Sequence, residues 1–217
     1  MNGRTGKTIW LVWGGLLLLV TLLMVGLLLQ IRSRANAREP LLVLGQVADF
    51  TLTNQNGRAV SLADLRGHVW VGDIIFTRCP GPCRKMTRQM NELEKALPVG
   101  SDVKLVTLTT DPEYDTPLIL KRYGEEYSAD PNRWMFLTGT KPQIRKLGVD
   151  SLKLSAVENK PDEHEDPNDL FIHATYFVLV DRKGQLRGVF QTTGEGIDPK
   201  QVQANILDSV RQLEREK

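Results

Sequence analysis

The stretch HVWVGDIIFTRCPGPCRKM, residues 68–86, leads from a predicted strand to a predicted helix through the only two cysteines of the chain. Residues 68–76 form a largely apolar run of strand length, as expected of a strand buried on both faces of a sheet. Apolar residues at helical spacing follow within residues 80–97. Cys79 therefore follows the strand and Cys83 lies in the first turn of the helix, with both sulfur atoms predicted on one face. The carboxyl end of a strand is where open α/β sheets place functional crevices.

Strands and helices alternate along the rest of the chain as well. A hairpin is predicted over residues 48–65, because the turn-rich NQNG separates two short strand-like runs. The remaining predicted elements are a strand at 103–109, a helix with Pro117 in its first turn, a strand at 133–139, a short helix at 141–148, a hairpin at 174–192 and a helix at 199–217. This order predicts an α/β fold with a mixed central sheet and helices on both faces.

Composition and charge narrow the class of protein. The chain has 217 residues, of which 41% are hydrophobic and 25% charged, as in a globular domain with an attachment. Arg4 and Lys7 are the only charged residues among the first 31, so the rest of the chain carries 26 basic and 26 acidic side chains. This balance gives no electrostatic reason to expect nucleic-acid binding.

The N-terminal region predicts a membrane anchor. Residues 9–31 carry no charge and no polar face, and their length matches the roughly 20 apolar residues that cross a bilayer as a helix. A cleaved signal peptide is the alternative, since residues 35–37 are Ala-Asn-Ala, but the apolar run is longer than the roughly 7 to 15 residues of a signal peptide. We predict a tail at 1–8, a retained transmembrane helix, a linker at 32–46 and a folded domain at 47–217. Basic residues flank both ends of the helix, so charge does not set its orientation.

Three interpretations of the cysteine pair are open: a structural disulfide, a redox couple and part of a metal site. A disulfide between Cys79 and Cys83 would close a loop of only a few residues, which removes little entropy from the unfolded chain. The predicted helix N-terminus should lower the pKa of the thiols and favour the thiolate, which both binds metals and attacks disulfides.

A histidine can complete a metal site. His173 immediately precedes the predicted strand that follows an acidic segment, residues 156–170. Together with two thiolates it makes a Cys₂His set, which favours Cu(I) and also suits Cu(II) or zinc. Structural zinc usually takes four protein ligands, so this set favours copper. His68 is interpreted as an exposed or capping residue, and His164, within the acidic segment, as solvated or an accessory metal contact.

Asp111 and Asp115 could be paired catalytic carboxylates. Asp111 is predicted to end a strand, however, and Asp115 to cap the next helix, a position that aspartate favours. We therefore predict a capping role. The acidic segment is predicted to be an exposed loop.

From about Asp49 onwards, the chain resembles the Sco/SenC family of membrane-anchored, thioredoxin-fold copper proteins. The matching stretches are FTRCPGPC (76–83), TTDPEYDTP (109–117), FLTGT (136–140) and HATYFVLVDRKG (173–184). The resemblance implies a thioredoxin-like fold with an N-terminal β-hairpin, and Cys79, Cys83 and His173 as copper ligands. The family's usual CPDxCP becomes CPGPCRK here, with Gly81 in place of an acid and Arg84 in place of a proline. That change should favour thiolate and shift the redox potential.

The resemblance also implies a function. It is that of a metallochaperone, not an enzyme, which carries Cu(I) or Cu(II) and assists assembly of the dinuclear copper centre of cytochrome c oxidase. The expected partner is the copper-receiving subunit of the oxidase or another copper protein. The expected location is the inner membrane, with the soluble domain on the periplasmic or intermembrane-space side. The alternatives are a thiol-disulfide oxidoreductase with Cys79 and Cys83 as its redox pair, a redox or copper sensor and, less favoured, a peroxidase.

Overall fold

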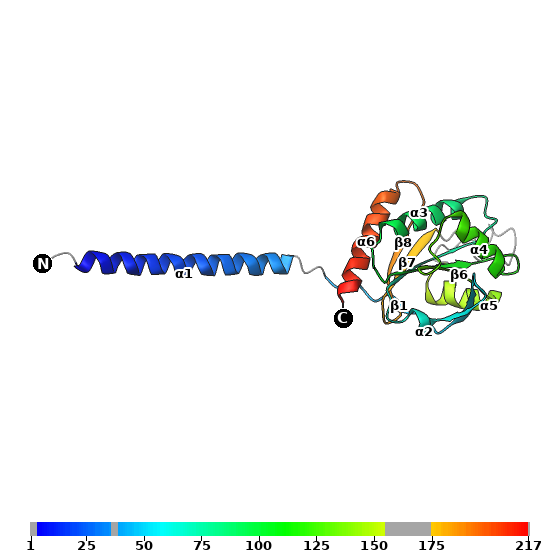
Figure 1. The fold of residues 1–217 in the computed structure, drawn as a ribbon, viewed down its shortest axis with the longest axis horizontal. Coiled ribbons are helices and arrows are strands. Elements are labelled where there is room, and N and C mark those ends of the chain that lie inside the picture. Colours follow the sequence, from blue (N-terminus) through cyan, green and yellow to red (C-terminus); the bar gives the residue numbers. More distant parts are fainter. Residues whose placement is uncertain (1–3, 36–38, 155–174, 217) are drawn as a thin grey trace. The chain divides into compact units, whose positions relative to one another are not determined.

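The computed structural model describes residues 4–35, 39–154 and 175–216, and divides the chain into two compact units, 1–40 and 41–217. The described part of the first unit forms the helix α1 (Arg4–Ala35) (Figure 1). Side chains of this helix are described at 13–28, and all of them are exposed. Within the described parts of the chain, no helix has both the length and the apolarity of a membrane span. The structure does not show the predicted anchor at 9–31.

The second unit is built on one mixed, eight-stranded sheet with the strand order β1-β8-β7-β4-β5-β6-β2-β3. Strands β4, β5 and β6 are parallel, and each of the other neighbouring pairs is antiparallel. The strands are β1 (Gly45–Gln46), β2 (Thr51–Asn54), β3 (Ala59–Ser61), β4 (Trp70–Ile75), β5 (Lys104–Thr109), β6 (Trp134–Thr138), β7 (Tyr176–Val180) and β8 (Gln185–Gln191). The predicted mixed sheet and both predicted hairpins are confirmed.

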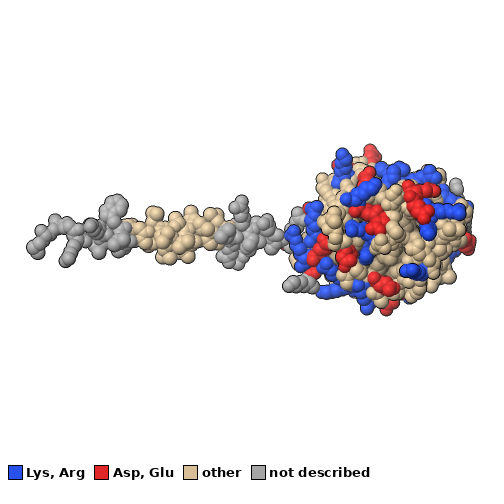
Figure 2. All heavy atoms as spheres, viewed as in Figure 1, with Lys and Arg blue, Asp and Glu red and all other residues tan. Residues whose placement is uncertain are grey.

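Helices cover both faces of this sheet (Figure 1). One face carries α3 (Pro82–Ala96), α4 (Pro117–Glu126) and α6 (Pro199–Arg215), and the other carries α2 (Leu62–Leu65), α5 (Lys141–Arg145) and the π-helix η1 (Lys146–Ser151). Each face of the sheet packs into its own hydrophobic core. Successive side chains of β4 point to opposite faces, so Val71 and Ile75 lie in the core on the α3 side and Trp70 and Ile74 in the core on the α5 side. Lys, Arg, Asp and Glu are interspersed over the visible face of the unit, as the balanced composition predicts (Figure 2).

The second unit begins at Leu41, earlier than the expected domain start at Val47. The Leu41 carbonyl oxygen accepts a hydrogen bond of 2.7 Å from Nη2 of Arg187, whose guanidinium is also paired with Asp181 and Glu216. The Arg187 side chain is only 7% exposed, so its donors need protein acceptors. Part of the expected linker is therefore attached to the sheet. A two-residue strand such as β1 is too short for its pattern to be recognised in the sequence.

Candidate metal centre

The two cysteines lie where the sequence places them. Strand β4 ends at Ile75, a turn follows in which the Cys79 N–H donates to the Phe76 carbonyl at 3.2 Å, and α3 begins at Pro82. Cys79 lies in that turn and Cys83 in the first turn of the helix. Proline suits the first helical position because its missing N–H would have no partner there. Both cysteines are free thiols, 4% and 7% exposed.

The ionisation predicted for the pair is wrong at Cys83. Burial raises the pKa of the Cys83 thiol to about 12, and a hydrogen bond between the two thiols acts in the same direction. The backbone of Phe76 acts in the opposite direction but does not compensate. Burial therefore outweighs the helix N-terminus, which was expected to favour the thiolate. The thiolate form of Cys83 needs a nearby positive charge, and a metal ion supplies one.

Asp115 holds the turn that leads to Cys79. Its buried carboxyl group accepts a hydrogen bond from the Thr77 backbone N–H at 3.0 Å and further bonds from the hydroxyl groups of Thr77 and Thr109. The predicted capping role is wrong, because the N-cap of α4 is Thr116, whose hydroxyl accepts from Ile119 N. Asp115 lies just before a helix, where aspartate often caps. Here, however, its carboxyl group accepts from Thr77, which follows β4, and from Thr109, at the end of β5. Asp115 ties the cysteine turn to strand β5.

Arg78, the residue before Cys79, is held from outside. Its guanidinium Nη2 lies 2.6 Å from a carboxylate oxygen of Asp111, and its Cζ lies 3.8 Å from the ring centroid of Tyr114. The Arg78 side chain is 57% exposed. The segment that follows β5 thus fixes the two positions before the first cysteine: Asp115 binds Thr77 from the interior, and Asp111 and Tyr114 contact Arg78 at the surface.

A buried acid lies beneath the helix that carries Cys83. Asp73 is fully buried in β4 on the α3 side of the sheet, with its Oδ1 accepting from the Thr107 hydroxyl at 2.6 Å and its Oδ2 without a partner among the described residues. Burial raises the pKa of Asp73 to about 7, and the bond from Thr107 opposes this rise. Sequence reasoning missed this residue. The signal was a carboxylate within an otherwise apolar strand, which is costly unless it is neutral or paired.

His173 lies outside the described residues, but the chain close to it is tied to α3. Thr175 is two residues further on. Its carbonyl oxygen accepts two hydrogen bonds from Thr192, one from the backbone N–H at 2.7 Å and one from the side-chain hydroxyl at 2.8 Å. The Thr192 carbonyl in turn accepts from Nε2 of Gln89 on α3 at 3.1 Å. Strand β7 then runs antiparallel to β4, pairing Val178 with Gly72. The chain therefore enters the sheet beside the carboxyl half of β4.

The other histidines are not brought to the thiols by any described contact. His68 precedes the amino end of β4, at the other end of a six-residue strand about 20 Å long. Its Nδ1 lies 2.8 Å from Asp102 and its side chain is 28% exposed, so the prediction of an exposed or capping residue becomes that of a half-buried, paired one. His164 and the acidic segment 156–170 lie outside the described residues. Within those residues, no three His, Cys, Asp or Glu side chains form a group that could hold a metal ion.

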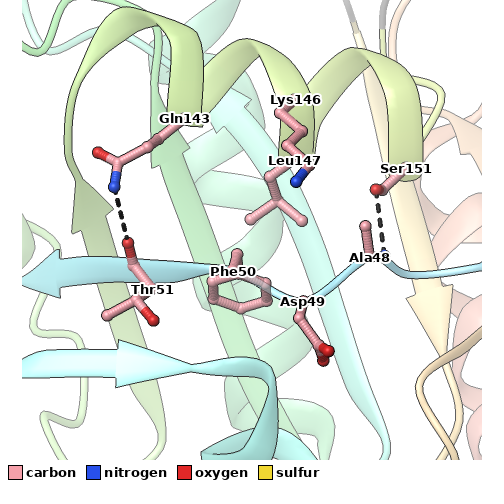
Figure 3. Close-up of a pocket in the computed structure, with 8 residues that line it drawn as sticks. All are labelled: Ala48, Asp49, Phe50, Thr51, Gln143, Lys146, Leu147 and Ser151. Carbon is pink, nitrogen blue, oxygen red and sulfur yellow. Dashed lines mark hydrogen bonds between the residues drawn. The ribbon is translucent and has the colours of Figure 1, made fainter.

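A surface hollow on the α5 side of the sheet is separate from the thiols. It is lined by Ala48, Asp49, Phe50, Thr51, Gln143, Lys146, Leu147 and Ser151. Figure 3 shows two hydrogen bonds across it, from Gln143 Nε2 to the Thr51 carbonyl at 3.3 Å and from Ala48 N to Ser151 Oγ at 3.2 Å. These bonds join the start of β2 to α5 and the chain just before β2 to η1, and neither cysteine lines the hollow.

Comparison with known proteins agrees with this architecture. The SCO1 protein homolog of Bacillus subtilis is 37% identical over 143 residues, which cover 65% of this chain and 71% of that protein. The structure of BsSco, described as a member of the Sco family of cytochrome c oxidase assembly proteins with a disulfide switch, is 32% identical with a TM-score of 0.67, covering 82% of this chain and all of that one. The copper-bound structure of Bradyrhizobium japonicum ScoI is 26% identical with a TM-score of 0.58, covering 76% and 99%. The model of the SCO1/SenC family matches residues 44–211, and the chain belongs to that family.

Proposed function

We propose that this chain is a copper chaperone that binds copper through Cys79, Cys83 and His173 and assists assembly of the dinuclear copper centre of cytochrome c oxidase. The observation that carries the proposal is the pair of adjoining, buried, free thiols at the carboxyl end of β4. The copper-bound ScoI structure and the oxidase-assembly role given for BsSco support it.

The chemistry of the donor set fits copper as a cargo. Two thiolates are soft ligands that favour Cu(I), and an imidazole adds a donor that also suits Cu(II). The Gln89–Thr192–Thr175 contacts bring the chain two residues after His173 beside α3, which supports a site shared with the cysteines. Both thiols must lose a proton before they bind the ion, and the pKa of Cys83 is about 12. Copper affinity should therefore fall as the pH is lowered.

Thiol-disulfide exchange is the second candidate function. It is favoured by the position of the two thiols, because the Cys79 side chain acts on the Cys83 thiol and helps to raise its pKa. The description of BsSco as having a disulfide switch supports it as well. In this reaction one thiolate attacks a partner disulfide and the second thiol resolves the mixed disulfide, so that the partner leaves reduced and the Cys79–Cys83 disulfide forms. This chemistry does not need His173.

Copper binding by variants separates the two functions. We expect the full chain to bind one copper ion. Cys83→Ser and His173→Ala should each weaken binding by more than the roughly 10- to 100-fold that loss of an outer-shell partner costs. Binding is measured by competition with a chromophoric chelator, and His68→Ala, the paired histidine at the other end of β4, is the matched control. Unchanged affinity in His173→Ala would exclude the Cys₂His site, and disulfide reduction by a wild type that binds no copper would favour the second function.

We also propose that residues 9–31 anchor the chain in the inner membrane, with the folded unit on the periplasmic or intermembrane-space side. Large apolar side chains along α1, from Trp13 to Leu28, are more than half exposed at most positions, as is suitable for contact with lipid. After expression in a bacterium, the full chain is expected to stay with membranes washed in alkaline carbonate, while a variant that begins at Glu39 is expected in the soluble fraction. Release of the full chain by carbonate would contradict the anchor.

A further inference from the structure

A partner protein can reach the two buried thiols only by contacting the surface residues around them. Cys79 and Cys83 are 4% and 7% exposed, so a partner that takes a metal ion or a disulfide from them must contact their exposed neighbours. Around the cysteines these are Arg78, Pro80, Gly81, Arg84 and Tyr114, which we call the thiol rim. The chemistry of the thiol rim therefore selects the partner.

The thiol rim and the first turns of the helix behind it are basic. From residue 76 to residue 91 the chain contains Arg78, Arg84, Lys85 and Arg88 and no acid, and all four side chains belong to exposed residues. The charge is a feature of this stretch, because the chain beyond its first 31 residues carries equal numbers of basic and acidic side chains. The amino end of the 15-residue helix α3 adds partial positive charge at the same place.

Acids of the neighbouring segment do not neutralise this charge fully. Asp111 pairs with Arg78, and Glu113 pairs with Lys141 at 3.2 Å. Within the described parts of the chain, no ion pair is formed by Arg84, which lies next to Cys83. Among the described residues, Arg84 is thus an exposed cation without an ion-pair partner, next to the second cysteine in the chain.

The thiol rim also presents a preorganised contact. Because the guanidinium of Arg78 lies between Asp111 and the ring of Tyr114, its position is held before a partner arrives. Tyr114 is itself 41% exposed. Arginine and tyrosine are among the residues that most often dominate the binding energy of protein interfaces, and an arginine fork matches a carboxylate in geometry.

We propose that the thiol rim is the docking surface for an acidic protein segment, in which carboxylates flank the cysteine or metal ligand that exchanges with Cys79 and Cys83. The identification of the partner rests on the proposed function, but the charge preference is a property of the thiol rim alone. Arg78 and Arg84 then act as specificity residues: they favour the approach of acidic segments and disfavour basic ones.

Two synthetic peptides test this preference without copper. Each contains one cysteine activated as a mixed disulfide with 2-thiopyridine, flanked by glutamates in one peptide and by lysines in the other. A thiolate of the reduced full chain attacks the peptide sulfur, a new disulfide forms, and 2-thiopyridone leaves with the electron pair and takes up a proton. The rate is followed by thiopyridone absorbance. The ratio of the two rates removes any effect of a variant on thiol reactivity itself.

The acidic peptide is expected to react at least about tenfold faster at low salt, with the ratio falling towards one at high ionic strength. Arg78→Gln and Arg84→Gln should each lower the low-salt ratio several-fold, whereas Arg58→Gln, an exposed arginine in the β2–β3 turn, should leave it unchanged. Arg84 has no described ion pair, so its variant tests the proposal even if Arg78→Gln disturbs the turn.

Equal rates for the two peptides at low salt would overturn the proposal, as would an equal loss of the ratio in Arg58→Gln and Arg84→Gln. The outcome is independent of the proposed function. A chain that prefers the acidic peptide but binds no copper keeps the docking surface and loses the chaperone role, and a chain that binds copper without preference does the reverse.

Discussion

Asp115→Ala is expected to lower the free energy of unfolding of the folded unit by about 3 kcal/mol or more. The variant removes a fully buried carboxyl group and leaves the backbone N–H of Thr77 and the hydroxyl groups of Thr77 and Thr109 without their acceptor. Each hydrogen bond of this kind contributes roughly 0.5–1.5 kcal/mol, and an unsatisfied buried donor costs about 1–3 kcal/mol. Urea unfolding followed by tryptophan fluorescence measures the change.

Asp111→Asn is the matched control for this prediction, because it alters an aspartate of the same segment whose partner, Arg78, is exposed. Exposed ion pairs contribute about 1 kcal/mol at most, so the loss should be small. In Asp115→Ala the turn is no longer tied to β5, and alkylation of Cys79 by iodoacetamide should be faster than in wild type. Equal stability of the two variants would show that Asp115 does not hold the turn.

Asp73→Asn is expected to remove a pH dependence of stability. The pKa of Asp73 is about 7 in the folded unit, above its value of 3.8 without burial, so between these pH values the folded state holds a proton that the unfolded state has lost. The contribution of Asp73 to the free energy of unfolding is therefore largest below about pH 4, falls as the pH rises, and is lost above about pH 7. The shift corresponds to about 4 kcal/mol at most. Between about pH 4 and pH 7, the free energy of unfolding of the wild type should fall by up to this amount relative to that of Asp73→Asn.

Thr107→Val provides a second arm of the same experiment. The Thr107 hydroxyl donates to Oδ1 of Asp73 and lowers the pKa of its carboxyl group. Without that bond the pKa should rise further, and the loss of stability should extend to higher pH. A difference between wild type and Asp73→Asn that stays constant from pH 4 to pH 8 would contradict the raised pKa.

Local pattern predicted the framework of the site well. The apolar run before Cys79 is β4, the helical spacing after it is α3, and the hairpins at 48–65 and 174–192 are present. These features follow from period and turn residues within about twenty positions, and such signals act on the chain locally. Strand β1 was missed because two residues carry no period. The π-helix that continues α5 was missed because no local residue pattern marks it.

By itself, the sequence determined that two cysteines follow a buried strand and begin a helix, because hydrophobic period and proline position are properties of neighbouring residues. Only the tertiary structure decided how those thiols behave. Burial in the folded unit raises the pKa of Cys83 against the effect of its own helix. Asp115, which is 32 positions after Cys83, holds the turn before Cys79 instead of capping a helix. The physical reason is that desolvation and hydrogen-bond partnership depend on residues far apart in sequence, which become neighbours only when the strands align.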